Sequence, residues 1–331
     1  MICVVKYVKI SLLFVISCFG LFYAFKSIEL TELLDQLYSI NLFKFFISIL
    51  ILIVACIIRA KRLKYLALPI DESISTHHLF GATMIGYFGN GILFFRLGEL
   101  LKAYAISQGK QIKPSESFGL IMLERLVDAV SVFFLLAIAL PFLPLDDKII
   151  RYWIIAFIVV TISLICILVI LNFLDWKFII NHLGFINKNL RAKIADLIAK
   201  IYDGLGLVFK TEKKIEILSC TILIWLCYFL MTKWLIESCH IELNLFDSFI
   251  VLILGAIIIS VPALPGGLGT YEAGITYAFT FLFFVSKDVA LTYAIVSHTS
   301  NYLPYIIIGF FYFIRSGVKI SSVKNNELNH D

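Results

Sequence analysis

The chain has 331 residues, of which 61% are hydrophobic and 15% are charged, and its formal net charge is +5. Soluble globular proteins average roughly 45–50% apolar and 25% charged residues, so this composition excludes an ordinary water-soluble domain. Many apolar residues lie in runs of about 20, the length that an α-helix needs to cross a bilayer. We therefore expect an all-α, polytopic helical membrane protein with about seven to eight membrane helices, forming one transmembrane domain over residues 1–331.

The N-terminal region is predicted to hold two membrane helices, at 10–25 and 43–58. The first is interpreted as an uncleaved anchor and not a signal peptide, because its apolar run continues past Cys18 without a polar interruption. The acidic segment 26–41 is expected to be an external loop. The second helix leads directly into the basic segment 59–64, and basic residues beside membrane helices favour the cytoplasm. The N-terminus is therefore also expected inside.

A glycine-rich stretch at 79–95 is predicted to be a broken element, and a basic segment at 96–113 follows it. If the stretch crossed the bilayer completely, the basic segment would lie outside, against the positive-inside rule. We therefore expect a re-entrant element that enters from the cytoplasm, breaks near Gly89 to Gly91, and returns to the same side.

The middle of the chain is predicted to continue with membrane helices at 117–141, 152–173 and 217–236. Between the last two, residues 175–216 carry apolar residues at helical spacing opposite lysines, which is typical of an amphipathic helix. We expect this segment to lie on the cytoplasmic leaflet, where anionic lipids attract lysine side chains.

A second broken element is predicted at 249–285, because residues 262–269 contain two prolines and three glycines. Proline removes a backbone donor and interrupts a helix, so no continuous span is expected here. The last predicted helix, 291–314, is followed by basic residues that indicate a cytoplasmic C-terminus. The second element must then enter from the outer side, and the two re-entrant elements point at each other from opposite leaflets.

Polar side chains concentrate at the two breaks and in the helix between them. Non-helical backbone at membrane depth is tolerated only where it is buried in protein or lines a wet cavity. A charged group at the centre of a span costs roughly 2.5–3.5 kcal/mol, so such groups are expected to face a partner or a cavity. Arginine offers a bidentate fork to phosphate, whereas the carboxylates could bind a cationic head group or protons. The predicted substrate-binding residues are Asn90, Arg96, Glu99, Lys102, Glu124, Arg125, Asp128, Gly266, Gly267, Gly269, Tyr271 and Glu272.

Two structural alternatives stand beside this interpretation. The charged residues could form a static ion-pair network that locks helices together, and the glycines could serve only to let helices cross closely. His77, His78 and His298 are expected to make ordinary hydrogen bonds and to bind no metal, and we expect no cofactor. The sequence lacks the GxxxxGK[ST] motif, so ATP hydrolysis through a P-loop is excluded.

Three separated motifs occur in order, at 89–99 (GNGILFFRLGE), at 124–128 (ERLVD) and at 265–269 (PGGLG) followed by Glu272. Together they resemble the flippase-like membrane domain of the lysylphosphatidylglycerol synthase family over nearly the whole chain, although Phe95 stands where the family commonly has proline. The resemblance implies a bacterial inner-membrane protein that moves a lipid between leaflets. The chain ends shortly after its last predicted helix, so the aminoacyl-transferase domain of the two-domain synthases is expected to be missing.

The leading functional hypothesis is a flippase or scramblase that moves a phospholipid or another lipid-linked intermediate through a midplane polar cavity. Its expected partners are membrane lipids and a separate lipid or glycan synthase, and no nucleic acid is expected. The alternatives are a membrane-embedded transferase that acts on a lipid-linked substrate and an accessory subunit of an envelope biosynthesis complex.

Overall fold

The structure is a computed structural model that describes residues 2–26, 28–140, 211–260 and 264–318, together with residues 151, 152, 155, 156, 158, 159, 162 and 163. Within these residues every regular element is helical and no strand occurs, in agreement with the predicted all-α class. Most of the predicted helix 152–173 and most of the amphipathic segment 175–216 lie outside the described residues.

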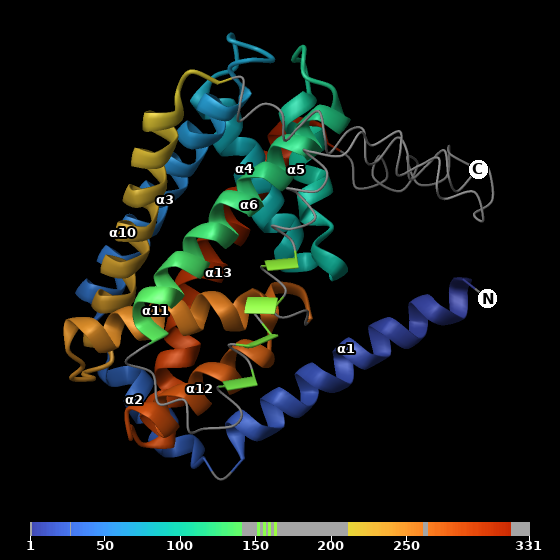
Figure 1. Cartoon of the computed structure of the whole chain (residues 1–331). Helices are drawn as coiled ribbons and strands as arrows, with labels where there is room; N and C mark the ends of the chain where they lie inside the picture. Colours follow the sequence, from blue (N-terminus) through green and yellow to red (C-terminus); the bar gives the residue numbers. More distant parts are fainter. Residues whose placement is uncertain are drawn as a thin grey trace.

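The described helices are numbered in chain order in Figure 1. The α-helices are α1 (Ile2–Phe25), α2 (Leu30–Ser39), α3 (Leu42–Ala67), α4 (Thr76–Ile92), α5 (Gly98–Ser107), α6 (Pro114–Ala139), α10 (Lys214–Ser238), α11 (Leu245–Ser260), α12 (Thr270–Leu282) and α13 (Lys287–Ser316). Two short 3-10 turns, η1 (Phe94–Arg96) and η3 (Pro265–Gly267), follow α4 and α11.

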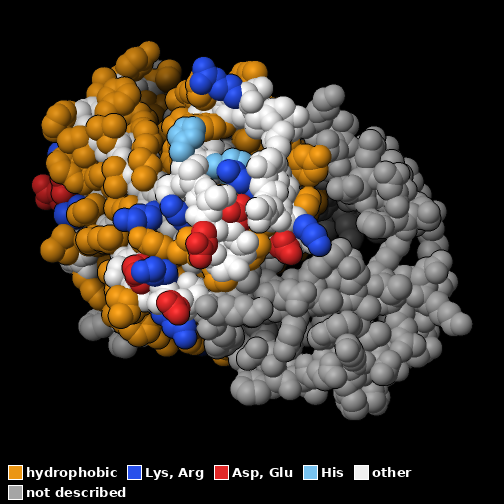
Figure 2. All heavy atoms as spheres, turned by 90° about the horizontal axis from the view of Figure 1, so that it is seen from above, with side chains coloured by type: hydrophobic (Ala, Val, Ile, Leu, Met, Phe, Trp, Pro, Cys, Tyr) orange, Lys and Arg blue, Asp and Glu red, His pale blue; other side chains and the backbone are white. Residues whose placement is uncertain are grey.

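Most helices run between two ends of the bundle, which are the top and the bottom of Figure 1. At the top end, Thr211 donates to the Tyr65 carbonyl of α3 at 3.1 Å, and the His78 ring of α4 contacts the Ile106 carbonyl of α5 at 2.9 Å. Figure 2 looks onto this end, where charged and histidine side chains lie near the centre and hydrophobic side chains cover much of the adjoining surface.

The bottom end joins helices from both halves of the chain. The backbone N–H of Asn41 donates to the Ser238 carbonyl at 2.9 Å, and Lys44 pairs with Glu237 at 2.7 Å, which ties the start of α3 to the end of α10. The Lys287 ammonium at the start of α13 donates to the Tyr23 carbonyl of α1 at 2.9 Å.

The first hairpin consists of α4 and α5, which meet at η1 and whose outer ends both lie at the top end. The two backbones approach so closely that a Cβ atom at Gly98 would lie 2.1 Å from the Gly86 carbonyl oxygen and 2.3 Å from the Asn90 nitrogen. Glycine is therefore required where these arms touch, because any side chain would force them apart.

The second hairpin consists of α11 and α12, which start and end toward the bottom end and meet near η3. Its tip contains Gly266, Gly267 and Gly269 with φ values of 73°, 83° and 87°, in the region that favours glycine. Helix α1 packs against this tip, where the backbone N–H of Leu264 donates to the Ser17 hydroxyl at 3.1 Å. Helix α1 therefore contacts the non-helical backbone between α11 and α12.

The tips of the two hairpins contact each other. Arg96 of η1 donates to the Ile259 carbonyl near the end of α11 at 2.7 Å. The Tyr302 hydroxyl of α13 donates to the Gly91 carbonyl of α4 at 3.1 Å, and its ring packs on Gly266, where a Cβ atom would lie 2.6 Å from the ring. Segments that are about 170 residues apart in the sequence thus form one junction.

Helices α3 and α10 lie side by side and each exposes an apolar face (Figure 1). The exposed side chains recur at spacings of three and four residues, so each set occupies one face of its helix. Apolar faces of this size are typical of surfaces that contact lipid or another protein. The exposed residues at this spacing are Phe43, Phe46, Leu50, Val54 and Ile57 on α3, and Ile215, Leu218, Ile222, Leu226 and Leu230 on α10, and Leu42 and Leu223 beside them are exposed as well.

Among the described residues, α3 and α10 are each long and apolar enough to cross a membrane. A bent pair formed by 14–25 and 30–39, with an angle of 84° between its parts, raises this number to three if it acts as one span. The predicted count of seven to eight membrane helices and the re-entrant character of the two hairpins stay predictions.

Several predicted boundaries differ from the structure, among them the following two. The segment 26–41, expected to be a loop, contains α2, because its leucines recur at helical spacing and Leu33 is buried. Helix α3 continues past the predicted end at residue 58 to Ala67, since Leu63 and Leu66 bury their side chains and the intervening lysines and arginines are good helix formers.

Candidate functional site

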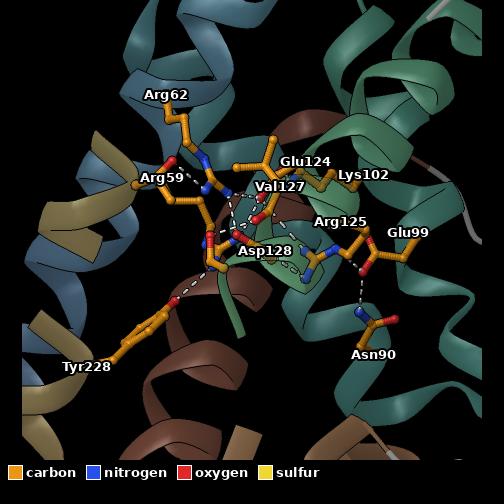
Figure 3. Close-up of polar contacts among 12 residues, drawn as sticks. Arg59, Arg62, Asn90, Glu99, Lys102, Glu124, Arg125, Val127, Asp128 and Tyr228 are labelled. Carbon is orange, nitrogen blue, oxygen red and sulfur yellow. Dashed lines mark hydrogen bonds and ion pairs between the residues drawn. The ribbon is translucent and has the colours of Figure 1, made fainter. Parts of the chain in front are cut away.

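A cluster of seven charged side chains from α3, α5 and α6 lies inside the bundle, and we refer to it as the charge cluster (Figure 3). Helix α3 contributes two arginines, α5 a lysine and a carboxylate, and α6 an arginine and two carboxylates. The members are Arg59, Arg62, Glu99, Lys102, Glu124, Arg125 and Asp128.

Glu124 occupies the buried centre of the charge cluster. One carboxylate oxygen accepts from Arg59 Nη1 at 2.7 Å, and the other accepts from Lys102 Nζ at 2.6 Å. The three side chains are between 0 and 5% exposed. Charges so deeply buried are stable only when they are paired and hydrogen-bonded, so Glu124 holds α3, α5 and α6 together.

Asp128 connects the same cluster to α10. It accepts from Arg59 Nη1 at 2.6 Å and from Arg62 Nη2 at 2.7 Å. The two arginines then reach α10, because Arg59 Nη2 donates to the Tyr228 hydroxyl at 3.1 Å and Arg62 Nη1 donates to Thr221 Oγ1 at 3.3 Å. Both arginines are therefore held rigidly from two sides.

The edge of the charge cluster is bonded less completely. Arg125 lies 3.4 Å from Glu99, 3.8 Å from Glu124 and 3.7 Å from Asp128, and its side chain is 31% exposed. Its buried Nε and Nη2 atoms have no hydrogen-bond partner among the described residues, and the same is true of Glu99 Oε2 and Asn90 Oδ1. This edge could thus accept a further polar group.

The charge cluster contains four cations and three carboxylates, which leaves one positive charge in excess. An unbalanced charge inside a low-dielectric interior is costly, because its hydration is lost without full compensation. An anion bound at the edge would remove this cost, and arginine matches the geometry of phosphate and carboxylate oxygens.

A second polar site lies at the tip of the second hairpin and involves far fewer charges. Glu272, in the first turn of α12, accepts from the backbone N–H of Gly269 at 2.7 Å. Its other oxygen is hydrogen-bonded to Nδ1 of His298 on α13, whose Nε2 lies 3.0 Å from the Gly266 carbonyl. Glu272 and His298 are 6 and 7% exposed, so water reaches neither side chain freely.

The predicted site residues therefore form two groups, not one. Asn90, Glu99, Lys102, Glu124, Arg125 and Asp128 lie in or beside the charge cluster, whereas Gly266, Gly267, Gly269 and Glu272 lie at the second tip with Tyr271 nearby. The Tyr271 hydroxyl contacts Ser297 at 3.1 Å. Arg96 stands between the groups, at the junction of the hairpins.

Four residues of these sites were missing from the sequence prediction: Arg59, Arg62, Tyr228 and His298. Arg59 and Arg62 had been assigned to a cytoplasmic basic segment, yet they are 4 and 0% exposed. They share a helix face with the buried Cys56 and Leu63, and this spacing could have indicated that they point inward. The three histidines do make hydrogen bonds, as expected.

The predicted midplane cavity stays a prediction. One open cavity of about 380 Å³ lies where α10 ends and α11 begins, and none of the twelve predicted residues lines it. No group of three or more histidine, cysteine, aspartate or glutamate side chains that could hold a metal ion occurs in the described part of the chain.

Comparison with known proteins supports the resemblance seen in the sequence. The family model described as the lysylphosphatidylglycerol synthase TM region matches residues 9–309, which include both hairpins and the whole charge cluster. No curated protein and no solved structure matches the chain. The matched region covers most of the sequence and contains spans that can cross a bilayer. The chain therefore belongs to the lysylphosphatidylglycerol synthase transmembrane-region family and is a multi-pass membrane protein with a function connected to membrane lipids.

Proposed function

We propose that this protein moves a lipid with an anionic head group between the leaflets of the bacterial inner membrane. The head group would pass along polar side chains at the hairpin tips, while the acyl tails stay in the surrounding bilayer. The observation that carries this proposal is the charge cluster, with its excess positive charge and its incompletely bonded edge at Arg125.

Helix length supports the prediction that both hairpins are re-entrant. Helix α5 has 10 residues and α12 has 13. At 1.5 Å per residue these arms are about 15 and 20 Å long, shorter than the roughly 30 Å of the hydrocarbon core. Arms of this length can reach the middle of the bilayer from one side, and tips that meet there would bring polar groups to the midplane.

Arg125 is the best candidate for contact with the head group. Lys102 and Glu124 bond to each other at 2.6 Å, Glu124 also accepts from Arg59 at 2.7 Å, and both side chains are closed to solvent, so they are better suited to a structural role. The Arg125 side chain is 31% exposed, and its buried Nε and Nη2 atoms lack a hydrogen-bond partner in the described structure. A phosphate oxygen placed beside its fork would gain charge-assisted hydrogen bonds.

Arg96 is the second candidate, because it occupies the tip itself. It adopts a positive φ of 55°, an unusual conformation for a residue other than glycine, and donates to the Ile259 carbonyl at 2.7 Å. Strained backbone of this kind persists where the surroundings enforce it, often at functional positions. Its exposed guanidinium retains further donors that could accompany a phosphate past the junction.

The proposed orientation places the top end of Figure 1 in the cytoplasm. The basic residues at the ends of α3 and α13 and at the start of α10 gather there, and basic residues beside membrane helices favour the cytoplasmic side. The first hairpin then opens inward and the second outward, and both termini are cytoplasmic. A separate lipid or glycan synthase would supply the transported lipid.

The experiment that tests this proposal measures leaflet exchange of fluorescent phospholipids and polyprenyl phosphates in liposomes that contain the purified protein. Arg125→Gln is expected to slow exchange by about tenfold or more, because a hydrogen bond to a charged group is worth roughly 1.5–3 kcal/mol. Arg125→Lys keeps the charge but lacks the bidentate guanidinium, so its exchange rate is expected to fall between those of the wild type and Arg125→Gln. The thermal stability of both variants should stay close to that of the wild type.

Lys61→Gln is the matched control, since it removes a positive charge from an exposed position on α3. Its exchange rate should equal that of the wild type. Undiminished exchange in both Arg125→Gln and Arg96→Gln would count against a head-group path through these residues. If the wild type exchanges no lipid in any condition, including an imposed proton gradient, the transferase or the accessory-subunit hypothesis takes precedence.

A further inference from the structure

We infer that Glu272 and His298 form a proton-binding site that controls whether the tip of the second hairpin is attached to α13. Its role in transport rests on the proposed function, but proton binding itself does not. The His298 ring is buried, and both of its nitrogen atoms contact oxygen atoms at or beside the tip of the second hairpin.

Each of the two ring nitrogen atoms of His298 contacts an oxygen atom. Nε2 lies 3.0 Å from the carbonyl oxygen of Gly266, and Nδ1 is hydrogen-bonded to Glu272 Oε1. A carbonyl oxygen only accepts, so a hydrogen bond to Gly266 requires a proton on Nε2. A neutral imidazole carries one N–H, which leaves Nδ1 as an acceptor when Nε2 is protonated. Nδ1 then faces the Glu272 oxygen, and one more proton must lie between them.

Two arrangements supply that proton. Either His298 is an imidazolium beside an ionised Glu272, or a protonated Glu272 donates to a neutral His298. Both arrangements hold the same number of protons, and both give the pair a total charge of zero. With one proton fewer, a neutral His298 donates from Nδ1 to the carboxylate, and the Nε2 lone pair opposes the Gly266 oxygen. The bond to the tip therefore exists only in the proton-loaded pair.

Because the pair is buried, losing this proton would cost free energy. Glu272 and His298 are 6 and 7% exposed, and no lysine or arginine in the described part of the chain forms an ion pair with Glu272. Without the proton, the pair would carry one negative charge in an interior that solvates charge poorly. The backbone N–H of Gly269 at 2.7 Å offsets only part of that cost.

Within the described ranges, the surrounding elements add no competing titratable partner. Tyr271 contacts Ser297, Tyr302 donates to the Gly91 carbonyl, and Arg96 donates to the Ile259 carbonyl. Helix α1 faces the tip with Ser17 and Gly20, neither of which titrates. The other ionisable side chains described on these elements are Cys18 and Tyr23 on α1 with Lys26 just after it, His77, His78 and Tyr87 on α4, Asp247 in the first turn of α11, Tyr277 on α12, Lys287 and Asp288 in the first turn of α13, and Tyr293, Tyr305, Tyr312 and Arg315 farther along α13.

The site is placed where it can affect both hairpins. Gly266 packs on the ring of Tyr302, and the hydroxyl of Tyr302 bonds to Gly91 at the end of the first hairpin. Loss of the proton would remove the His298–Gly266 bond and loosen this junction. In a lipid translocase, proton binding would close the path between the tips and proton release would open it.

Glu272→Gln imitates the proton-loaded pair. Its amide can donate to Nδ1 of His298 while its carbonyl oxygen accepts from Gly269, so Nε2 keeps its proton and the tip stays attached. His298→Asn has the opposite effect, since the shorter side chain reaches Glu272 or Gly266 but not both. Glu242→Gln, at an exposed position, is the matched control for the charge change.

The experiment combines two readouts on the full chain in liposomes. Infrared difference spectra between acidic and alkaline pH should show a protonated carboxyl or an imidazolium signal that Glu272→Gln and His298→Asn abolish and Glu242→Gln retains. Phospholipid exchange by the wild type should accelerate as pH rises, by up to about tenfold per pH unit for one coupled proton. Exchange should be independent of pH in both site variants, slow in Glu272→Gln and fast in His298→Asn.

The outcomes separate this inference from the proposed function. Lipid exchange that is equal at every pH in the wild type, with no infrared signal dependent on Glu272 or His298, overturns the proton site and leaves the translocase intact. An infrared signal that depends on both residues, in a protein that exchanges no lipid, supports the proton site and overturns the translocase. The claim that the proton-loaded pair attaches the tip to α13 is also overturned if Glu272→Gln exchanges lipid as fast as the wild type does at alkaline pH.

Discussion

The first hairpin, α4–α5, carries fixed charges along its second arm, whereas the second hairpin, α11–α12, carries a single carboxylate beside its tip. Glu99 and Lys102 of the first hairpin join a network of seven charges that extends into α3 and α6. Glu272 of the second hairpin has one side-chain partner in the described part of the chain, His298. The two tips nevertheless meet, through Arg96 and Tyr302.

The difference shows two ways in which a membrane protein can keep polar groups in its interior. In the charge cluster that the first hairpin joins, arginine and lysine pair with carboxylates, and arginine stays protonated at every physiological pH. In the second hairpin, the neutrality of the Glu272–His298 pair depends on the one proton between the carboxylate and the imidazole. The first arrangement is suited to a permanent site and the second to a switch. Variants that remove one group at a time should separate these roles.

The largest effect is expected from Glu124→Ala, which removes the centre of the charge cluster. Arg59 and Lys102 would lose bonds of 2.7 and 2.6 Å in a region closed to solvent. Removing one partner of a buried ion pair typically costs about 3–5 kcal/mol. We expect a large fall in the thermal unfolding temperature in lipid nanodiscs, with a similar fall across the physiological pH range.

Glu72→Gln provides the control for this experiment, since it removes a carboxylate at an exposed position between α3 and α4. Exposed substitutions usually change stability by less than about 0.5 kcal/mol. If Glu124→Ala were as stable as this control, the charge cluster would not be what holds α3, α5 and α6 together.

A smaller effect is expected from Gly98→Ala, which tests the packing of the first hairpin and not its charges. The new methyl group would lie 2.1 Å from the Gly86 carbonyl oxygen, so the arms would have to separate. Overpacking of this kind typically costs about 1–3 kcal/mol. Gly255→Ala on α11 is the matched control, because its nearest contact is a side chain at 3.9 Å. A helix gains stability when alanine replaces glycine without a clash, so this control should unfold no earlier than the wild type.

The positions of both breaks could be predicted from the sequence because glycine and proline act locally on the backbone. The predicted break at Gly89 to Gly91 lies where α4 ends, at Ile92, and the predicted break at 262–269 falls between α11 and α12. The positive φ values of the second tip explain why glycine occurs there.

The partners across the bundle could not be predicted in the same way. The positive-inside rule counts basic residues near a helix end, but it does not say which of them point inward, so Arg59 and Arg62 were taken for surface residues. The direction of each side chain depends on how α3 faces α6, and this is a property of the tertiary fold. His298 lies 26 residues from Glu272 on another helix, and no local pattern relates them.

The smallest effect is expected from Tyr228→Phe, which removes one neutral partner of the charge cluster and leaves every charge in place. Arg59 would lose the bond of 3.1 Å to the hydroxyl but keep Glu124 and Asp128. A hydrogen bond of this kind contributes about 0.5–1.5 kcal/mol. Tyr38→Phe, at a position that is 86% exposed, is the control, and thermal unfolding in nanodiscs is the measurement. A loss of stability as large as that of Glu124→Ala would mean that α10 holds Arg59 more strongly than α6 does. The ion pairs between Arg59 and α6 would then be assigned a role in binding the lipid head group.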